Sequence, residues 1–392
     1  MSTLRRQGRR YRPANKLPLA ILLFCLNASI VWAQKIAAIG DYGVNDINEA
    51  SVATLVKSFN PDFVITIGDN NYPFGAAETI DQNIGQYYQE YIYPYNGIYG
   101  NGDTVNRFYP ILGNHDVLTQ NGQPYLDYFT LPGNERYYHI IKGDVHLFAL
   151  NSNPSEPDDI DSNSVQAQWL KDRLAASTAK WKIVYLHHAP YSSCSNHGST
   201  PVMQWPFQQW GASAVIGADD HTYERLMVNG FPYFVNGLGG CCPYEFGDPL
   251  MGSVVRYSAD FGAMLIDANR DSITFKFINI SNELIDCFTL GGKNASCFEV
   301  VCEVGESHLQ VAPNPVNGNP TIQYCVFEKT PILLSIYNSN GEVIETLVDN
   351  NDHDPGQYLI KFNASNIAAG IYFCELRYGN VKYTKRLVVV AD

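Results

Sequence analysis

Short apolar runs alternate with amphipathic stretches along the first two thirds of the chain. An apolar run over residues 35–40 precedes a stretch whose apolar residues recur at helical spacing, namely Ile47, Val52, Leu55, Val56 and Phe59. A second apolar run spans residues 62–68. The same order returns later, with a helical pattern through Trp169 and Leu174 before an apolar run over 181–186. Strand–helix–strand order predicts parallel strands that are buried on both faces in a layered α/β fold.

Two long segments, 71–106 and 189–210, are rich in Tyr, Gly and Asn and show no clear period. Loops of this length in a compact domain usually carry function. We expect these two segments to govern the choice of substrate.

The pattern changes after about residue 303, where apolar residues alternate with polar ones. This period of two is typical of strands, and it recurs through Ile322 to Val326, Leu334 to Ile336 and Tyr358 to Phe362. Turn sequences separate the three stretches. The C-terminal segment is therefore predicted to be a small antiparallel β-sandwich without a cluster of carboxylates and histidines.

The N-terminal segment and the charge balance limit where the protein acts. Basic residues precede an uncharged run over 17–33, and Val31 and Ala33 suit a cleavage site before Gln34. This pattern predicts an export signal over residues 1–33, with a membrane anchor as the alternative. The whole chain has a net charge of −13. So acidic a chain is a poor general binder of nucleic acid or anionic membrane, although bound cations would still allow a small anionic substrate.

The chain has nine cysteines, and removal of the signal with Cys25 would leave an even number. In an exported protein this number predicts disulfide bonds, although the sequence does not fix the pairing. Our hypotheses are a bond between Cys325 and Cys374, a pairing within the set Cys287, Cys297 and Cys302, and a bond from Cys241 or Cys242 to Cys194.

Five predicted strands run directly into side chains that can bind metal ions. They span residues 35–40, 62–68, 107–113, 181–186 and 211–217. The side chains are Asp41, then Asp69 with Tyr72, then Asn114 with His115, then His187 with His188, and finally Asp219 with His221. The carboxyl ends of parallel strands meet at one crevice, so residues far apart in sequence are expected to converge there.

The residue types suit two cations that act together. Such a pair can clamp the attacking and leaving oxygens of an in-line displacement, and it needs a bridging carboxylate and oxygen ligands on both sides. Imidazoles favour transition metals. Histidines that do not bind metal can then transfer protons.

Four segments resemble the calcineurin-like metallophosphoesterases: residues 40–43, 68–72, 113–116 and 184–187. Tyr72, three residues after the second aspartate, makes the resemblance closest to the purple acid phosphatases of the small, tartrate-resistant type. The resemblance covers about residues 35–280 and implies an α/β (α+β) fold, a layered β-sandwich flanked by helices.

The resemblance also implies a role for each matched residue. Iron(III) would be held by Asp41, Asp69, Tyr72 and His221. A divalent ion (Fe, Mn or Zn) would be held by Asp69, Asn114, His187 and Asp219, with Asp69 bridging the two. His115 and His197 would bind phosphate and protonate the leaving group, and the nucleophile would be a metal-bound hydroxide.

Two positions leave the ligand set open. Aligning Tyr223, Glu224 and Arg225 with the family places Asp219 where a histidine is usual. A carboxylate still suits a hard divalent ion, but if Asp219 points away the second metal would bind weakly. Spacing selects His187 as the other ligand, with His188 as the alternative.

The last 80 or so residues resemble the sorting domain of the type IX secretion system. The matching residues are Asn314-Pro315, residues 336–341, Ala369 to Tyr372 and residues 385–388. This resemblance implies contact with the secretion machinery and a secreted or cell-surface location. The alternative is an accessory β-sandwich for carbohydrate or surface binding.

We therefore expect a signal peptide over 1–33, a catalytic domain over 34–300 and a sorting domain over 301–392. The expected function is a secreted acid phosphatase that acts on small phosphate monoesters, with no nucleic-acid partner and no stable membrane insertion. The alternatives are a phosphodiesterase or nucleotidase on the same scaffold, and a surface binding protein with a decayed metal site.

Overall fold

The computed structural model describes residues 33–292 and 309–390, apart from 313, 317, 319, 327–328, 354–355 and 380. The predicted export signal over residues 1–33 therefore lies almost wholly outside the described residues, as does the expected domain boundary near residue 300. Cys297 and Cys302 lie outside them too, together with the pairing we expected there. None of the helices described is both long and apolar enough to span a membrane.

Two mixed sheets form the larger part of the chain. The first has the strand order β13-β12-β11-β1-β2-β3, and the second has the order β10-β8-β9-β7-β6-β5-β4. The strands of the first sheet are β1 (Gln34–Ile39), β2 (Phe63–Thr66), β3 (Phe108–Tyr109), β11 (Gly262–Ala268), β12 (Ser272–Asn279) and β13 (Leu284–Gly291). Those of the second are β4 (Tyr138–Lys142), β5 (Val145–Ala149), β6 (Trp181–His188), β7 (Ala214–Ala218), β8 (Tyr223–Val228), β9 (Phe231–Asn236) and β10 (Ser253–Tyr257).

The strands that the sequence pattern predicted are parallel to one another. β1, β2, β6 and β7 lie inside the sheets, whereas β3 is an edge strand. β1 pairs with β2 and β2 with β3 in the first sheet, and β5, β6 and β7 pair in succession in the second. β6 shows why its apolar run is continuous. Ile183 and Tyr185 join the core shared with the first sheet, whereas Val184 and Leu186 join the core beneath α5 (Val165–Ala176).

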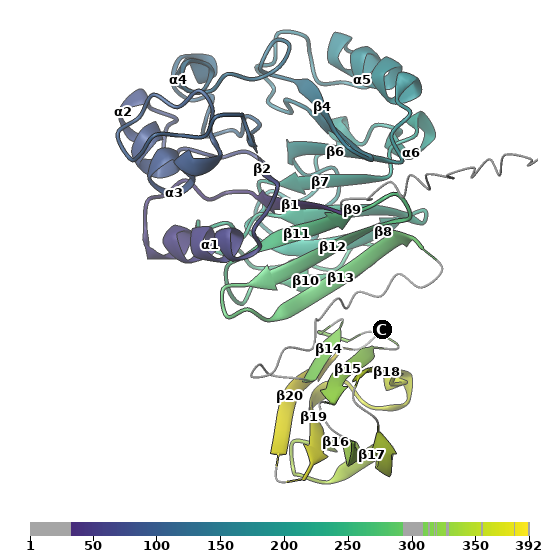
Figure 1. Ribbon diagram of the computed structural model, residues 1–392. Helices are drawn as coiled ribbons and strands as arrows, with labels where there is room; N and C mark the ends of the chain where they lie inside the picture. Colours follow the sequence, from purple (N-terminus) through teal and green to yellow (C-terminus); the bar gives the residue numbers. More distant parts are fainter. Residues whose placement is uncertain are drawn as a thin grey trace, which may run out of the picture. The chain divides into compact units, whose positions relative to one another are not determined.

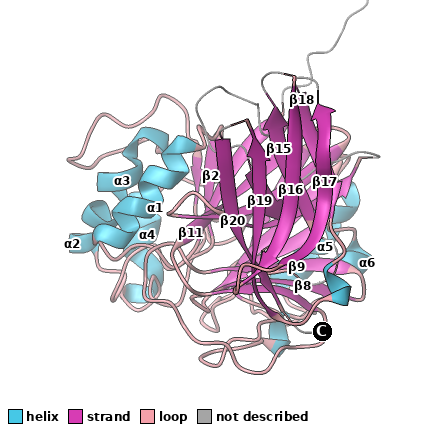
Figure 2. Cartoon of the chain, turned by 90° about the horizontal axis from the view of Figure 1, so that it is seen from below, coloured by secondary structure: helices cyan, strands magenta, loops and turns pink. Residues whose placement is uncertain are grey.

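Helices cover the outer sides of both sheets. α1 (Ile47–Ser58) begins at Asp46, whose carboxylate accepts hydrogen bonds from the backbone N–H groups of Asn48 and Glu49. Val52 and Val56 of α1 are buried, but Ile47 is 76% exposed, so the prediction that Ile47 shares the buried face is wrong. Figures 1 and 2 both show α1 to α4 grouped on one side and α5 and α6 on the other. The remaining bounds are α2 (Ala77–Ile80), α3 (Gln86–Tyr88), α4 (Gln123–Tyr128) and α6 (Phe207–Trp210).

Two details of the sequence prediction differ from the structure. Segment 71–106 is partly helical, with α2, a π-helical turn over Asp81–Gly85, α3 and a 3₁₀ turn over Gln89–Tyr91. The apolar run over 107–113 forms a strand only at Phe108–Tyr109, because beyond β3 the chain turns toward the carboxylate of Asp116.

The C-terminal part contains two small antiparallel sheets, which confirms the predicted class. One has the order β14-β15-β18 and the other β17-β16-β19-β20. Their strands are β14 (Leu309–Ala312), β15 (Thr321–Val326), β16 (Thr330–Asn338), β17 (Val343–His353), β18 (Gly356–Lys361), β19 (Gly370–Tyr378) and β20 (Val381–Val389).

Two of the expected disulfide bonds are not formed. Cys374 is free and points into the C-terminal core with Ile322 and Tyr324. Cys325 neighbours Tyr324 on β15, and successive side chains of a strand point to opposite faces, so Cys325 faces away from Cys374. Cys194 is also free, as are Cys241 and Cys242, so the expected bond between that pair and Cys194 is absent too.

Candidate metal centre

Three aspartates follow parallel strands and turn toward one place. Asp41 comes after β1, Asp69 after β2 and Asp219 after β7, and their φ angles are 56°, 53° and 69°. This left-handed backbone is uncommon for residues other than glycine and concentrates at functional sites. The backbone N–H of Asp219 donates to Asp41 Oδ2 over 3.2 Å. All three side chains are buried, which leaves three carboxylates together below the protein surface.

His187, at the end of β6, directs one nitrogen at these carboxylates. Its Nδ1 donates to the carbonyl oxygen of Ile67 over 2.7 Å, so in the neutral ring Nε2 carries the lone pair. Nε2 lies 3.5 Å from Asp69 Oδ1 and 3.5 Å from Asp219 Oδ1. A metal-binding histidine is typically oriented by such a bond from its other nitrogen.

His188, the alternative ligand, points elsewhere. Its Nδ1 lies 2.8 Å from Ser152 Oγ, and burial lowers its pKa to about 4. Adjacent residues of a strand face opposite sides, so only one of the two histidines can reach the aspartates. In the structure His187 lies beside the aspartates and His188 does not.

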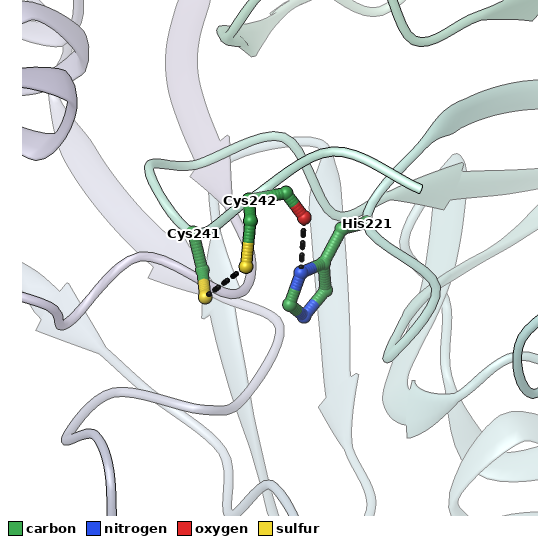
Figure 3. Close-up of side chains that lie close together, drawn as sticks. All are labelled: His221, Cys241 and Cys242. Carbon is green, nitrogen blue, oxygen red and sulfur yellow. Dashed lines mark hydrogen bonds between the residues drawn. The ribbon is translucent and has the colours of Figure 1, made fainter. Parts of the chain in front are cut away.

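His221 and Tyr72 also face Asp41. His221 Nδ1 donates to the carbonyl oxygen of Cys242 over 2.8 Å, which leaves the lone pair on Nε2. Figure 3 shows this hydrogen bond. This Nε2 is 3.6 Å from Asp41 Oδ1 and 3.2 Å from the hydroxyl of Tyr72. The Tyr72 hydroxyl is in turn 3.3 Å from Asp41 Oδ1. The Nε2 atoms of two imidazoles thus face the carboxylates.

The side-chain amide of Asn114 completes the group. Its Oδ1 lies 2.8 Å from His187 Nε2, and the same amide position is 3.3 Å from Asp69 Oδ2 and 3.3 Å from Asp219 Oδ1. An oxygen surrounded by acceptors fits a cation ligand, whereas the amino end would donate at this position if no cation were bound. The donor set of carboxylate, amide, phenol and imidazole groups is one that iron, manganese and zinc accept.

The electrostatics of this group also require positive charge. Burial raises the pKa of Asp41 well above its usual value. Burial likewise disfavours the charged form of His187, but the carboxylates of Asp69, Asp41 and Asp219 outweigh it and raise that pKa. Within 33–292 and 309–390, no lysine or arginine forms an ion pair with any of the three aspartates. A bound cation would supply the missing charge.

The two histidines expected beside the substrate occupy different settings. His115 is at the edge of the group, where its backbone N–H donates to Asp69 Oδ1 over 2.8 Å and its Nε2 is 3.8 Å from Asp69 Oδ2. Its Nδ1 donates to the carbonyl oxygen of Pro73. His197 is exposed; its backbone N–H donates to Asp220, and its ring is 5.8 Å from that of Tyr244. The structure therefore brings His115 directly to the aspartates and His197 only to their surroundings.

Two buried residues, Asn70 and Asp116, hold the candidate ligands in place, and the sequence did not predict this role. Asp116 accepts hydrogen bonds from the backbone N–H of Gly113 and the amide of Asn70, which link the ends of β2 and β3. Burial and the charge of Asp69 raise the pKa of Asp116 to about 6. A Cβ on Gly113 would lie 2.1 Å from Asp69 Oδ1, so only glycine fits there. Asn70 lies within residues 68–72 and Asp116 within residues 113–116. The spacing of these motifs does not distinguish a metal ligand from a residue that positions a ligand.

Two family descriptions match the chain. Residues 34–223 match the calcineurin-like phosphoesterases, and residues 310–390 match the secretion system C-terminal sorting domain. The first family implies a binuclear metal site. The second implies contact with a secretion system and a secreted or cell-surface location.

Individual relatives agree with this assignment. Tartrate-resistant acid phosphatase type 5 of Homo sapiens is 24% identical over 251 residues, which is 56% of this chain and 77% of the human protein. The purple acid phosphatase PPD1 from seeds of yellow lupin (Lupinus luteus) superposes with a TM-score of 0.55 at 17% identity, over 67% of this chain and 54% of the lupin chain.

A third relative has a different role. GAP50, described as the anchor in the inner membrane complex of Plasmodium, superposes with a TM-score of 0.54 at 18% identity, over 67% of this chain and 89% of that one. At these identities the two solved structures show a common fold only. The matched families and the human relative show more: this chain is a calcineurin-like metallophosphoesterase related to the purple and tartrate-resistant acid phosphatases, and it carries a C-terminal sorting domain of type IX secretion.

Proposed function

We propose that the protein is an exported acid phosphatase that hydrolyses phosphate monoesters at a binuclear metal centre. One observation carries this proposal: three buried aspartates and two imidazole lone pairs face one another, and no lysine or arginine of the described residues is paired with those aspartates. Such a group costs free energy unless cations bind to it.

The ligands fall into two sets that share one residue. The first set is Asp41, Asp69, Tyr72 and His221, which offers hard oxygen donors suited to Fe(III). The second set is Asp69, Asn114, His187 and Asp219, which suits a divalent ion. Asp219 supplies an oxygen where an imidazole is usual, so we expect the second set to favour iron or manganese over zinc. When bound, the two ions supply Lewis acidity and lower the pKa of water.

Two side chains of the protein would handle substrate and protons. The bond from His115 Nδ1 to Pro73 fixes the ring, so Nε2 is the nitrogen that faces the site. This atom, close to Asp69 and partly open to solvent, is placed to bind phosphate and protonate the leaving alkoxide. His197 would assist from the segment between β6 and β7. Asn70 and Asp116 act by positioning the two turns.

Export completes the proposal. A signal peptide over residues 1–33 would carry the chain out of the cytoplasm, and the sorting domain over 301–392 would direct it across the outer membrane. The catalytic domain, residues 34–300, would then meet phosphate esters outside the cell.

The test combines metal analysis with hydrolysis of paired substrates. We expect about two metal ions per chain in the purified protein and faster turnover of an aryl phosphate monoester than of the matching diester. Faster diester turnover would reverse the substrate assignment and favour a phosphodiesterase or nucleotidase. A protein with no tightly bound metal and no hydrolysis of either ester would contradict the proposal.

A binding function is the second candidate, and two observations favour it. Asp219 replaces the usual histidine, and the fold also matches GAP50, which is described as an anchor. This candidate predicts a protein that keeps its fold but does not retain the second metal. The metal count of the test above separates the two candidates.

A further inference from the structure

Two adjacent cysteines lie beside the metal centre. Cys241 and Cys242 follow β9, and Figure 3 shows their sulfur atoms next to each other. The two sulfur atoms are 3.5 Å apart. Cys242 is exposed and Cys241 is partly buried, whereas the other free cysteines of the described residues, Cys194 and Cys374, are buried. Oxidation of a thiol requires access as well as thiolate character. By exposure, Cys241 and Cys242 are the pair that an external oxidant can reach.

The backbone of this pair holds two residues of the metal centre. The N–H of Cys241 donates to the carbonyl oxygen of Asp41 over 2.9 Å. The carbonyl oxygen of Cys242 accepts from His221 Nδ1 over 2.8 Å. Tyr244 adds to this, since its ring stacks on that of His221 with centroids 4.1 Å apart. The cysteine pair is thus directly linked to Asp41 and His221.

Two other roles for Cys241 and Cys242 fit the structure less well, namely binding a metal ion together with His221 and forming a disulfide bond with Cys194. His221 cannot offer Nδ1 to a metal between the sulfurs, because that nitrogen donates to Cys242, and Nε2 faces Tyr72 and Asp41. Cys194 is buried, and its thiol donates to the carbonyl oxygen of Glu245. Each cysteine of the pair instead has the sulfur of its neighbour in sequence within 3.5 Å.

We propose that Cys241 and Cys242 are a reversible modification site, at which a disulfide oxidant converts the two thiols into a vicinal disulfide. One S–S bond forms between the two residues, the S–S bond of the oxidant breaks, and two electrons and two protons pass to the oxidant as two thiols. A low-molecular-weight or protein disulfide of the exporting compartment is a suitable oxidant.

The covalent geometry makes this bond easy to reverse. Adjacent Cα atoms joined by a trans peptide are about 3.8 Å apart, below the usual range of about 4.4–6.8 Å for disulfides. The sulfurs must also approach by about 1.5 Å to form a bond of about 2.05 Å. Strained and exposed disulfides have more oxidising potentials and serve as labile or regulatory bonds.

Closing the ring would change the metal centre, and this part of the inference rests on the proposed function. The S–S bond closes a ring that contains the Cα atoms of both cysteines and the peptide bond between them. The N–H of Cys241 and the carbonyl of Cys242 are attached directly to this ring. These are the two groups that bind Asp41 and His221. The thiol form makes both hydrogen bonds, so we expect the disulfide form to bind metal about tenfold more weakly, as is usual when a partner of a metal-binding histidine is lost.

The test uses the full exported chain, treated with oxidised glutathione or with dithiothreitol and then alkylated without unfolding. In wild type, oxidation should protect two thiols, and the peptide that contains both cysteines should be lighter by two hydrogen atoms. Cys241→Ser and Cys242→Ser should each remove this change. Full alkylation of both residues after oxidation, or a mapped bond from either to Cys194, would overturn the proposal.

Chelator competition on the same samples tests the link to the metal centre. Wild type should lose about tenfold in metal affinity on oxidation and regain it on reduction, while Cys242→Ser should not respond to oxidant. Equal affinity in both states, with the disulfide mapped, would overturn the link to His221. Absence of metal in both states, with the disulfide still mapped, would instead count against the proposed phosphatase.

Discussion

His187 donates its Nδ1 proton to the carbonyl oxygen of Ile67 over 2.7 Å, and this bond decides which nitrogen faces the three aspartates. Because β6 alternates its side chains, His188 turns to Ser152 instead. The two neighbouring histidines are therefore a matched pair for mutagenesis.

Replacing His187 with Ala should remove the second metal ion, while His188→Ala should leave the metal count unchanged. We expect affinity for that ion to fall by at least about tenfold in the first variant, because a ligand loss should cost no less than the loss of a partner of a ligand. Metal analysis after dialysis measures this. The reverse result, with metal lost only from the His188 variant, would refute the ligand assignment.

Asp219→Ala tests the position at which this chain departs from its family. The carboxylate lies 3.5 Å from His187 Nε2 and only 7% of the residue is exposed, so it points into the centre rather than away from it. We expect the variant to lose the second ion and most of its turnover. Asp219→His should restore binding and shift the preference toward zinc. A variant with full metal content and full rate would show that Asp219 is no ligand.

Tyr72→Phe should keep most of the metal and lose any visible absorption that arises from a phenolate bound to Fe(III). The hydroxyl is 3.3 Å from Asp41 Oδ1 and 3.2 Å from His221 Nε2, and it is the only atom that the change removes. An absorption spectrum recorded at matched iron content measures the effect. An unchanged spectrum would exclude Tyr72 as the source of the colour.

His115→Ala should lower kcat by roughly 10²- to 10⁴-fold, the usual contribution of a general acid, with both metals retained. A phosphate ester with a good leaving group needs little protonation, so its hydrolysis should suffer less than that of an alkyl ester. Comparison of the two esters separates a proton donor from a residue that only binds phosphate. An equal loss for both esters would favour phosphate binding alone.

Acid should destabilise the protein through His146, far from the proposed ligands. This side chain bonds to His139 and Ser177, and burial lowers its pKa to about 4. In the unfolded chain the imidazole titrates near 6.5. Between about pH 6.5 and 4 the unfolded state binds a proton at His146 and the folded state does not. The free energy of unfolding therefore declines as the pH falls from about 6.5 toward 4. Urea unfolding should show a shallower decline for His146→Gln, and equal slopes would contradict this.

The sequence allowed the parallel half of the fold to be predicted, because each buried strand there is a continuous apolar run that ends in a polar residue. The antiparallel half was less clear. β11 and β12 each combine a short buried run with partly exposed residues, so neither shows a continuous apolar run. No polar site residue follows either strand to indicate where it ends. β3 was predicted too long, since Ile111 and Leu112 are buried but lie outside any strand.

The convergence of the candidate ligands could be predicted for the same reason, but their orientations could not. Spacing selected His187, yet only the bond to Ile67 shows which nitrogen faces inward. Asp116 accepts a hydrogen bond from the backbone of Gly113, and Cys242 accepts one from His221 through its own carbonyl. Contacts to or from the backbone have no signature in the sequence. The Cys325–Cys374 hypothesis failed because it ignored that neighbours on β15 face opposite ways.

The left-handed backbone of Asp41, Asp69 and Asp219 bears on how such a centre can be lost in evolution. Asparagine and glycine adopt this conformation more readily than other residues. A single substitution of either kind would remove a carboxylate and relieve repulsion among buried charges without disturbing the turn that carries it. The fold can therefore persist after the metal centre is lost, and a descendant without metal ions would keep the same fold for a different function.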